Sequence, residues 1–243
     1  MKQANLVLHC GARKVERNQV ELVPTPERTK TWTPLSHIDL VRQIESVLDM
    51  NNLKVVNQVH ALTHDGLRYF GLMQIQNGQE QDDYTWILGL RNSHDKSFPA
   101  GLLVGAQVFI CDNLSFSSEI KMLRKHTVHI KRDLPMLTER AIGKLHDKWH
   151  SQDKRIEAYK GRDIADKEAH DLVIRAVDVR ACTPSRIPMV LRHWRQPQYE
   201  DFTPRTLWSL FNSFTQVLKD NFTELPKRTE ALHGLMDSYS GLN

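Results

Sequence analysis

The chain has few cysteines and no long apolar run, and these absences exclude several classes of protein. Its three cysteines, Cys10, Cys111 and Cys182, lie far apart and form no CxxC pair, so a zinc site built on thiolates is not expected. We interpret them as reduced residues of a cytosolic protein. No stretch approaches the roughly 20 apolar residues of a membrane-spanning helix, and the N-terminal apolar run is too short for a secretory signal. We therefore expect a cytoplasmic protein with no membrane partner.

The common motifs of catalysis and cofactor binding are missing as well. The sequence has no glycine-rich phosphate loop, no dinucleotide-binding fingerprint and no G-x-S-x-G turn around a nucleophilic serine. His146 and His150 stand four residues apart on an expected helix, but Asp147 occupies the position at which a zinc protease carries glutamate. We therefore expect no metal and no cofactor, and we favour a protein that is not an enzyme.

The chain does have enough apolar sequence for a folded core, and its charge is unevenly distributed. Of its 243 residues, 40% are apolar and 26% are charged, with a formal net charge of +4, which is ordinary for a folded domain. Residues 121–162 contain 12 Lys or Arg and 5 Asp or Glu, a local balance of +7, so the remainder sums to −3. Such a local excess of cations is typical of a nucleic-acid-binding surface, and also of a long solvated helix.

The first half of the sequence predicts an arm, a helix and a sheet. Prolines within residues 1–35 forbid a continuous helix and predict an extended arm. Apolar residues at helical spacing after Ser36 predict a helix over residues 37–50. The apolar period then changes to two, and Asp65-Gly66 and Asn77-Gly78 predict tight turns. Strands are predicted for residues 55–62, 67–75, 84–90 and 102–111.

From residue 117 onward the chain is expected to be mainly helical. A long helix is expected to start around Asp133 and Pro135 and to continue past Trp149. Residues 207–218 carry a further apolar stripe, and a last helix follows Pro226. We predict an α+β fold: an extended arm, a helix and an antiparallel β-meander over residues 1–116, then a mainly helical region, 117–243, packed on the sheet as one compact unit.

Two polar clusters flank the fourth expected strand and could form one site. Asn92-Ser93-His94-Asp95 follows the third strand, and Asp112-Asn113 follows the fourth. His94 could act as a base with Asp95 as its orienting carboxylate, and the two clusters together could hold a metal ion or a phosphate. Because adjacent strand residues point to opposite faces, His94 and Asp95 can bond one another only in a turn. A hydrogen-bonded turn, in which Asn, Ser and Asp bond their own backbone, is the structural alternative.

The cations of residues 121–162 form a second candidate site. Those that we expect to contact phosphates are Lys121, Arg124, Lys125, Lys131, Arg132, Arg140, Lys144 and Lys148. On a continuous helix Arg140, Lys144 and Lys148 would line one face, along which a phosphate backbone could run. His126 and His129 are expected to add to the polarity of this surface.

Several segments resemble a known family. The central motif lies at residues 92–97 and 108–114, an N-terminal motif at 9–12, 24–26 and 32–34, and a late-helix motif at 206–215. The family is that of phage- and plasmid-type proteins with the domain of unknown function numbered nine hundred and thirty-two. This resemblance implies a mobile-element gene in a bacterial host cell. It implies no activity and assigns no site residue.

Three functions stay open on these grounds. The first is a non-enzymatic protein that binds single-stranded nucleic acid, either alone or as a homo-oligomer; the order helix, meander, helix is shared in outline with single-strand annealing proteins of phage recombination systems. The second is a module that binds a host protein and interferes with a host defence system. The third is a metal-assisted hydrolase that uses His94, Asp95, Asp112 and Asn113. We favour the first because of the local charge and the mobile-element resemblance.

Overall fold

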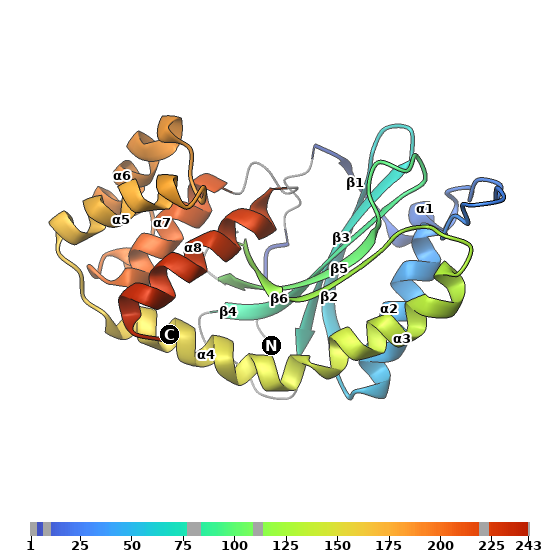
Figure 1. The fold of residues 1–243 in the computed structure, drawn as a ribbon, viewed down its shortest axis with the longest axis horizontal. Helices are drawn as coiled ribbons and strands as arrows, with labels where there is room; N and C mark the ends of the chain where they lie inside the picture. The colour runs from blue at the N-terminus through green and yellow to red at the C-terminus, as the bar shows by residue number, and fades with distance from the viewer. Residues whose placement is uncertain (1–3, 7–10, 77–83, 109–113, 219–223, 243) are drawn as a thin grey trace. The chain divides into compact units, whose positions relative to one another are not determined.

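The described part of the chain has an α+β fold, as the sequence predicts. The computed structural model describes residues 4–6, 11–76, 84–108, 114–218 and 224–242, without the side chains of residues 106–108, 114–121 and 146–150. A sheet is followed by a mainly helical half (Figure 1). The chain divides into two compact units: a sheet unit, Met1–Asp112 with Ser118–Leu145, and a helical unit, Asn113–Ser117 with His146–Asn243. The packing of the helical region on the sheet stays a prediction.

The sheet has six strands that follow one another in the order of the sequence. The strands are β1 (Arg13–Val15), β2 (Lys54–Leu62), β3 (Arg68–Gln76), β4 (Tyr84–Ser93), β5 (Ala100–Val108) and β6 (Leu114–Arg124). Each pairing from β1 to β5 is antiparallel. The predicted meander is therefore confirmed, and β1 and β6 extend it at its two edges. The turn predicted at Asn77-Gly78 lies outside the described residues.

Helix α2 (His37–Met50) covers one face of the sheet with the bounds that its apolar spacing predicts. Leu40, Val41, Ile44, Val47 and Leu48 are all at most 3% exposed. Helix α2 contacts β2 and β4, and both α1 (Arg17–Glu21) and α3 (Ile130–Gly143) pack against it. Figure 1 shows α2 and α3 on the same side of the sheet. The apolar face of α2 is thus the centre of the sheet unit's core.

The mainly helical region starts later than the expected residue 117, because β6 continues to Arg124 and the next helix begins at Ile130. Apolar residues occupy the alternate positions Leu114, Phe116, Ile120 and Met122, interrupted only by Ser118, which is the pattern of a strand with one buried face. The alternation is visible at its end, where Met122 is 4% exposed and Leu123 is 46% exposed. A strand signal was therefore present in the sequence.

The helix expected from Asp133 starts earlier and ends sooner. Helix α3 begins at Ile130, includes Pro135 and ends at Gly143, with Lys144 as its C-cap. Helix α4 (Leu145–Gly161) follows it. Arg140 and Lys148 therefore lie on different helices and in different units. The spacing of four residues between Arg140, Lys144 and Lys148 therefore does not place the three cations on one helix face.

The helical unit contains most of α4 and packs its later helices around large apolar side chains. These helices are α5 (Asp166–Asp178), α6 (Ile187–Arg195), α7 (Leu207–Leu218) and α8 (Leu225–Ser240), with the 3-10 turns η1 (Pro184–Arg186) and η2 (Glu200–Phe202). Helix α7 packs against α6 and α8. Its predicted stripe is confirmed, since Leu207, Leu210, Phe211 and Phe214 are at most 2% exposed. Gly241 ends α8 at a φ of 77°, a conformation that glycine adopts readily.

A nearly buried ion pair joins α4 to α8 within the helical unit. The Arg155 guanidinium donates to both carboxylate oxygens of Asp237, at 2.7 to 3.0 Å. The Tyr159 hydroxyl donates to the same carboxylate at 2.6 Å. Burial, and then this hydrogen bond, raise the pKa of Tyr159, so the phenol stays protonated. Two residues of α4, Arg155 and Tyr159, therefore both donate to the Asp237 carboxylate, and Arg155 balances its negative charge.

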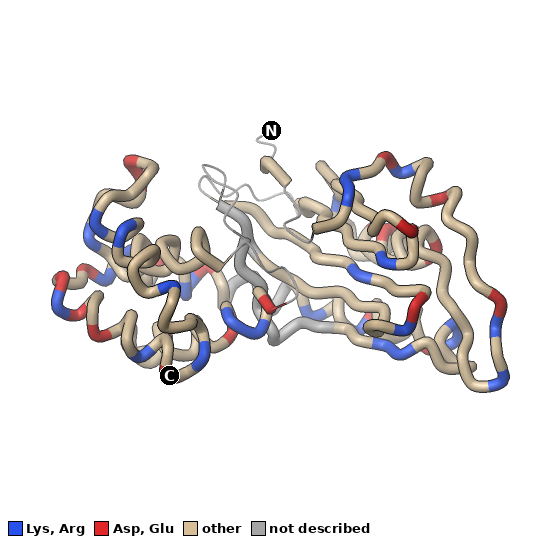
Figure 2. The backbone as a smooth tube through the Cα atoms, turned by 90° about the horizontal axis from the view of Figure 1, so that it is seen from above, with Lys and Arg blue, Asp and Glu red and all other residues tan. Residues whose placement is uncertain are grey.

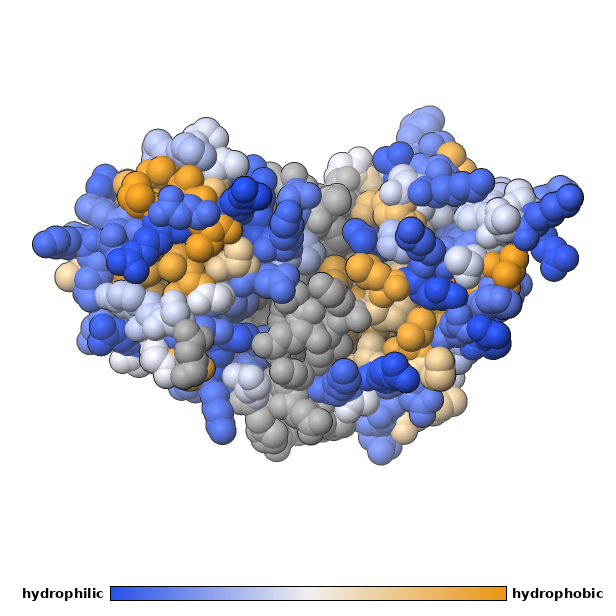
Figure 3. Space-filling view, viewed as in Figure 1, coloured by the Kyte–Doolittle hydropathy of each residue, from blue (hydrophilic) through white to orange (hydrophobic). Residues whose placement is uncertain are grey.

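Charged and apolar side chains are both distributed over the surface. Lys and Arg occur throughout both units with Asp and Glu interspersed (Figure 2). Apolar side chains gather in patches on the face drawn in Figure 3. The exposed large apolar side chains include Met136 in the sheet unit and Ile174, Val179 and Met189 in the helical unit. No helix among the described residues is long and apolar enough to cross a bilayer.

Candidate functional site

Asn92 lies at the centre of a buried polar network at the end of β4. Its side chain is 0% exposed. The amide nitrogen donates to the Leu35 carbonyl at 2.8 Å and to Nδ1 of His37 at 2.9 Å. The amide oxygen accepts from Nε2 of His126 at 2.8 Å. Asn92 therefore joins the N-terminal arm, the start of α2 and the loop between β6 and α3.

The network fixes one tautomer for each of its three histidines. His37 Nε2 donates to the Gly66 carbonyl at 3.0 Å, which leaves its Nδ1 free to accept from Asn92. His94 Nε2 donates to the Leu35 carbonyl at 2.9 Å. Since a carbonyl oxygen only accepts, His37 and His94 carry their proton on Nε2. His126 does so as well, because its Nε2 donates to the amide oxygen of Asn92. His94 Nδ1 is buried and has no hydrogen-bond partner among the described residues.

Burial keeps these imidazoles neutral. Burial, and then the neighbouring His94, lower the pKa of His37 to about 3. Burial lowers the pKa of His126 to about 4 in the same way. The pKa of His94 is also lowered, chiefly by burial. Neutral rings with settled tautomers serve here as hydrogen-bond connectors between segments.

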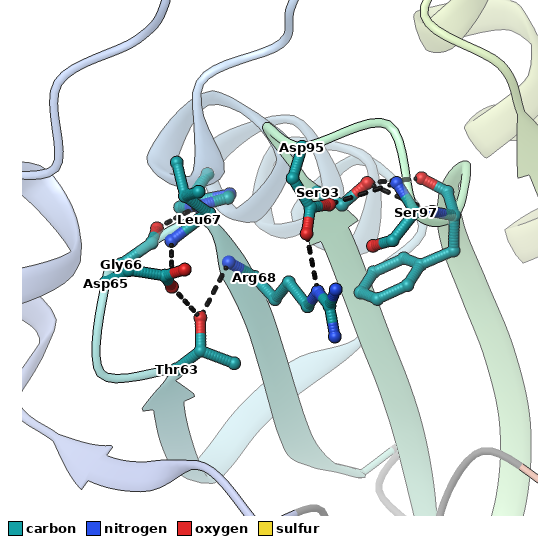
Figure 4. A network of polar contacts seen from close by, with 10 residues as sticks. Thr63, Asp65, Gly66, Leu67, Arg68, Ser93, Asp95 and Ser97 are labelled. Atoms are coloured by element: carbon teal, nitrogen blue, oxygen red, sulfur yellow. Dashed lines mark hydrogen bonds and ion pairs between the residues drawn. The ribbon is translucent and has the colours of Figure 1, made fainter.

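Asp95 points away from this network and builds a turn. One carboxylate oxygen accepts from the Ser97 amide at 3.0 Å and the other from Arg68 Nε at 2.6 Å (Figure 4). Burial raises the pKa of Asp95, but the hydrogen bonds from Ser97 and Arg68 lower it more, to about 2. His94 and Asp95 therefore have separate partners and do not bond one another. The neighbouring predicted turn is confirmed: Gly66 has a φ of 70°, and Asp65 accepts from Thr63 and Leu67 (Figure 4).

Above the buried network, Lys96 and Trp32 form a cation–aromatic pair. The Lys96 ammonium lies 4.8 Å from the centroid of the half-buried Trp32 ring. Trp32 stacks on His126, with centroids 6.1 Å apart. The Thr33 amide donates to the His126 carbonyl at 3.1 Å, which fixes the arm at this point. Lys96 has a φ of 65°, which is uncommon for a residue with a side chain and strains the loop.

The cations predicted to bind phosphate divide into two groups. Arg124 and Arg132 both bind Asp133, at 2.5 and 2.8 Å. The other four whose side chains are described, Lys125, Lys131, Arg140 and Lys144, are exposed and form no ion pair with any described residue. Residues 124–144 thus present four unpaired cations beside two that share one carboxylate. Lys121 and Lys148 have side chains outside the description.

Part of the hydrolase hypothesis falls on residues that are not described. Asp112 and Asn113 lie outside the described residues, so their separation from His94 stays open. His94 and Asp95 themselves bind Leu35 and Arg68. No group of three or more His, Cys, Asp or Glu among the described residues is arranged to hold a metal ion. The hydrolase hypothesis stays a prediction and gains no support from the described residues.

The sequence did not indicate His37, His126 or Trp32 as members of this site. His126, expected at the surface, is 7% exposed and belongs to the buried network. Trp32 falls in the N-terminal motif and Asn92 in the central motif, and the structure brings the two motifs together. Among the sequence signals, only these two family motifs could have suggested that Trp32 and Asn92 share a site, because no local spacing connects residues so far apart in the sequence.

A family model described as a domain of unknown function (DUF932) matches residues 26–231. The chain belongs to this family. The DUF932 match includes Trp32, the whole buried network around Asn92 and residues 124–144. The comparison with curated proteins gave no match, and neither did the comparison with solved structures.

Proposed function

We propose that this DUF932 protein binds single-stranded nucleic acid without catalysing a reaction. The observation that carries the proposal is the pair formed by Lys96 and Trp32, a half-buried aromatic ring with an ammonium group 4.8 Å from its centroid. Proteins that bind single strands combine aromatic rings, on which bases stack, with cations that contact phosphates. Lys96 and Trp32 supply one of each, and the buried network beneath holds both in place.

The cations for the rest of the phosphate backbone come from the segment that follows His126. Lys125, Lys131, Arg140 and Lys144 are exposed and form no ion pair with a described residue. A cation that is not already paired releases counterions when a phosphate binds, which gives affinity that falls with salt. Asp133 and Glu139 are the only acidic residues of segment 124–144. The balance of this segment therefore favours a polyanion.

The proposal is tested by measuring the affinity of the full chain for a fluorescent oligothymidylate across a salt series. Reversing two charges, Arg140→Glu with Lys144→Glu, should weaken binding at low salt at least about tenfold and make the salt slope shallower. Lys96→Glu should weaken it to a similar degree. Lys54→Glu is the control for Lys96→Glu. Lys54 is exposed at the start of β2, about 26 Å along the strand from Leu62 at 3.3 Å per residue, and Leu62 is linked through its partner Tyr69 to Asn92 at the Lys96 end of the sheet. Lys54→Glu should leave affinity nearly unchanged.

The contribution of Trp32 is tested separately. Trp32→Phe keeps an aromatic face and should retain most of the affinity, whereas Trp32→Leu should lose about fivefold or more, since stacking on one base contributes about 1–3 kcal/mol. Affinity that does not respond to salt, or equal losses for Lys54→Glu and Lys96→Glu, would contradict the proposal. Circular dichroism of each variant separates lost binding from lost folding.

A second candidate, a module that binds a host protein, is supported by exposed apolar side chains of the helical unit. Ile174 on α5, Val179 after it and Met189 on α6 are each more than 40% exposed, and α5 packs against α6. Exposed apolar groups of this kind often mark protein interfaces. A partner recovered from nuclease-treated lysate in stoichiometric amount, and lost with Ile174→Asp and Met189→Asp, would favour this candidate over the first.

A further inference from the structure

We propose that Arg91 binds a phosphate group on the face of the sheet that points away from α2. Arg91 lies near the end of β4 and is paired with Phe70 on β3 and with Gly101 on β5. The next residue, Asn92, bonds His37 of α2. Because adjacent strand residues point to opposite faces, the Arg91 side chain points away from α2 and from the buried polar network.

The Arg91 guanidinium is held partly out of water without an anionic partner. Arg91 is half-buried, and its side chain forms no ion pair or hydrogen bond with a described residue. Its Nε is buried and unpaired, whereas its two terminal nitrogens are open to solvent. Burial lowers the pKa of Arg91, and no neighbouring carboxylate raises it. Since a guanidinium stays charged in proteins, this arrangement is unfavourable until an anion binds to the terminal nitrogens.

Phe98 and Gly101 shape the place that the guanidinium occupies. The guanidinium carbon lies 5.4 Å from the centroid of the Phe98 ring, and this ring lies 5.4 Å from the Phe70 ring. A Cβ atom at position 101 would lie 3.3 Å from Cγ and Nε of Arg91, so glycine gives the arginine room to lie across β5. The side chain is therefore positioned before a ligand binds, which lowers the entropic cost of binding.

A second arginine makes this surface positive. Arg68 points to the same face as Arg91, because it pairs with Ser93, which is two residues and about 7 Å along β4 from Arg91. Asp95 accepts from Arg68 Nε at 2.6 Å (Figure 4), so it balances that guanidinium and leaves Arg91 unbalanced. Paired donors on a guanidinium match phosphate oxygens, and a phosphate monoester carries about −1.5 to −2 charges at pH 7, more than a carboxylate. Phosphate is therefore the ligand that suits this surface.

This site is separate from the contacts proposed for single-stranded nucleic acid. The Lys96–Trp32 pair lies with the buried network, since Trp32 stacks on His126 and His126 bonds Asn92. Asn92 and Arg91 point to opposite faces of the sheet. The Arg91 site goes beyond the single-strand proposal, because it requires only a phosphate group, on a strand or on a small molecule.

The test is an NMR titration of the isotope-labelled full chain with sodium phosphate at pH 7 and constant ionic strength. We expect the Nε–H signal of Arg91, assigned by its loss in Arg91→Lys, to shift saturably with phosphate and much less with sodium acetate. The Gly101 amide follows binding in the variants. Arg91→Met should weaken phosphate binding at least about tenfold, and Arg91→Lys, which keeps the charge but loses the paired donors, at least about threefold. Arg28→Met is the matched control, because Arg28 is exposed and pairs with no described residue.

Urea unfolding separates a binding role of Arg91 from a packing role. Arg91→Met removes an unpaired charge and keeps an apolar stem over Phe98, so its unfolding midpoint should not fall below that of the wild type. A clearly lower midpoint would count against the proposal, because Arg91 would then stabilise the fold without a ligand. The proposal is overturned if phosphate does not shift the Arg91 signal, if acetate shifts it as strongly, or if Arg91→Met and Arg28→Met bind phosphate alike.

Oligothymidylates with and without a 5′-phosphate identify the source of the phosphate. A shift of the Arg91 signal with both assigns the site to the backbone of a strand, and a shift with the phosphorylated strand alone assigns it to a strand end. If inorganic phosphate binds but neither strand does, the site serves a small phosphate compound. Arg140→Glu with Lys144→Glu should leave phosphate binding at Arg91 unchanged, because α3 lies with α2 on the other side of the sheet (Figure 1). Failure of this site and failure of the single-strand proposal can therefore be told apart.

Discussion

The imidazole rings of His37 and His94 lie face to face, with centroids 3.9 Å apart and planes 6° apart. Two protonated rings at this distance would repel one another with little solvent between them. The stack is therefore incompatible with protonation of both rings. It couples the start of α2 to the end of β4 and makes the sheet unit sensitive to acid.

We expect acid to destabilise the sheet unit well above the pH at which its carboxylates titrate. The pKa values of His37 and His126 are about 3 and about 4 in the folded chain, below the ordinary 6.5. Below pH 6.5 the unfolded chain takes up protons that the folded chain does not, so stability is complete above pH 6.5 and is lost as pH falls toward the folded values. Between pH 7 and 5.5 the two histidines together should remove about 2 to 3 kcal/mol of unfolding free energy, measured with urea. A variant with His37→Gln and His126→Gln should start less stable but lose less on acidification; an equal loss would contradict this account.

Asn92 should be among the most sensitive positions of the sheet unit. Asn92→Ala removes three hydrogen bonds and leaves the Nε2 donor of His126 unpaired, which should cost about 2–4 kcal/mol. Asn92→Asp keeps the shape but cannot donate to Leu35 or His37, and should cost at least as much. Asn57→Ala, which removes one bond to the Ala4 carbonyl from a half-buried side chain, is the control and should cost about 1 kcal/mol. Chemical denaturation measures all three, and similar values for Asn92→Ala and Asn57→Ala would refute the central role of Asn92.

Asp133 should oppose polyanion binding, because its carboxylate occupies Arg124 and Arg132. Asp133→Asn removes the negative charge that pairs with both guanidinium groups and should tighten oligonucleotide binding about two- to fivefold at low salt, with a steeper salt dependence. Asp49→Asn makes the same charge change at the exposed end of α2, where Asp49 pairs with no described residue, and serves as the control. Weaker binding by Asp133→Asn in a variant that remains folded would show that the pairing orders a binding surface instead.

In the helical unit, Asp237→Ala should be strongly destabilising because it removes the carboxylate that accepts from Tyr159 and binds the Arg155 guanidinium, whose side chain is only 13% exposed. Losses for breaking a buried pair on one side are about 3–5 kcal/mol. Tyr159→Phe removes one hydrogen bond to the same carboxylate and should cost about 1 kcal/mol. Replacing both charges, as in Arg155→Met with Asp237→Leu, should recover part of the loss. Thermal unfolding of the four chains checks the order, and a double variant no more stable than Asp237→Ala would contradict it.

Local sequence patterns predicted the elements of this fold but not the connections between them. The bounds of α2 and the Asp65-Gly66 turn follow from apolar spacing and from the backbone freedom of glycine, which act over a few residues. The alternation in β6 was present but was outweighed by the charged residues that follow it. The partners of Asn92 could not be predicted, since His126 is 34 residues and His37 is 55 residues away in sequence. Strand pairing and helix packing decide which histidines reach Asn92. Neither can be deduced from the local sequence around one residue.

The Leu35 carbonyl accepts hydrogen bonds from Asn92 and His94, which follow it by 57 and 59 residues. On a ribosome that adds about 5–20 residues per second, the arm is complete for roughly 3 to 12 seconds before the residues that hold it have been made. During that interval Trp32 and its neighbours are without their partners. The arm should therefore dock late, after β4 has paired and His126 has been made, and the surface that it carries should mature after the central strands of the sheet unit.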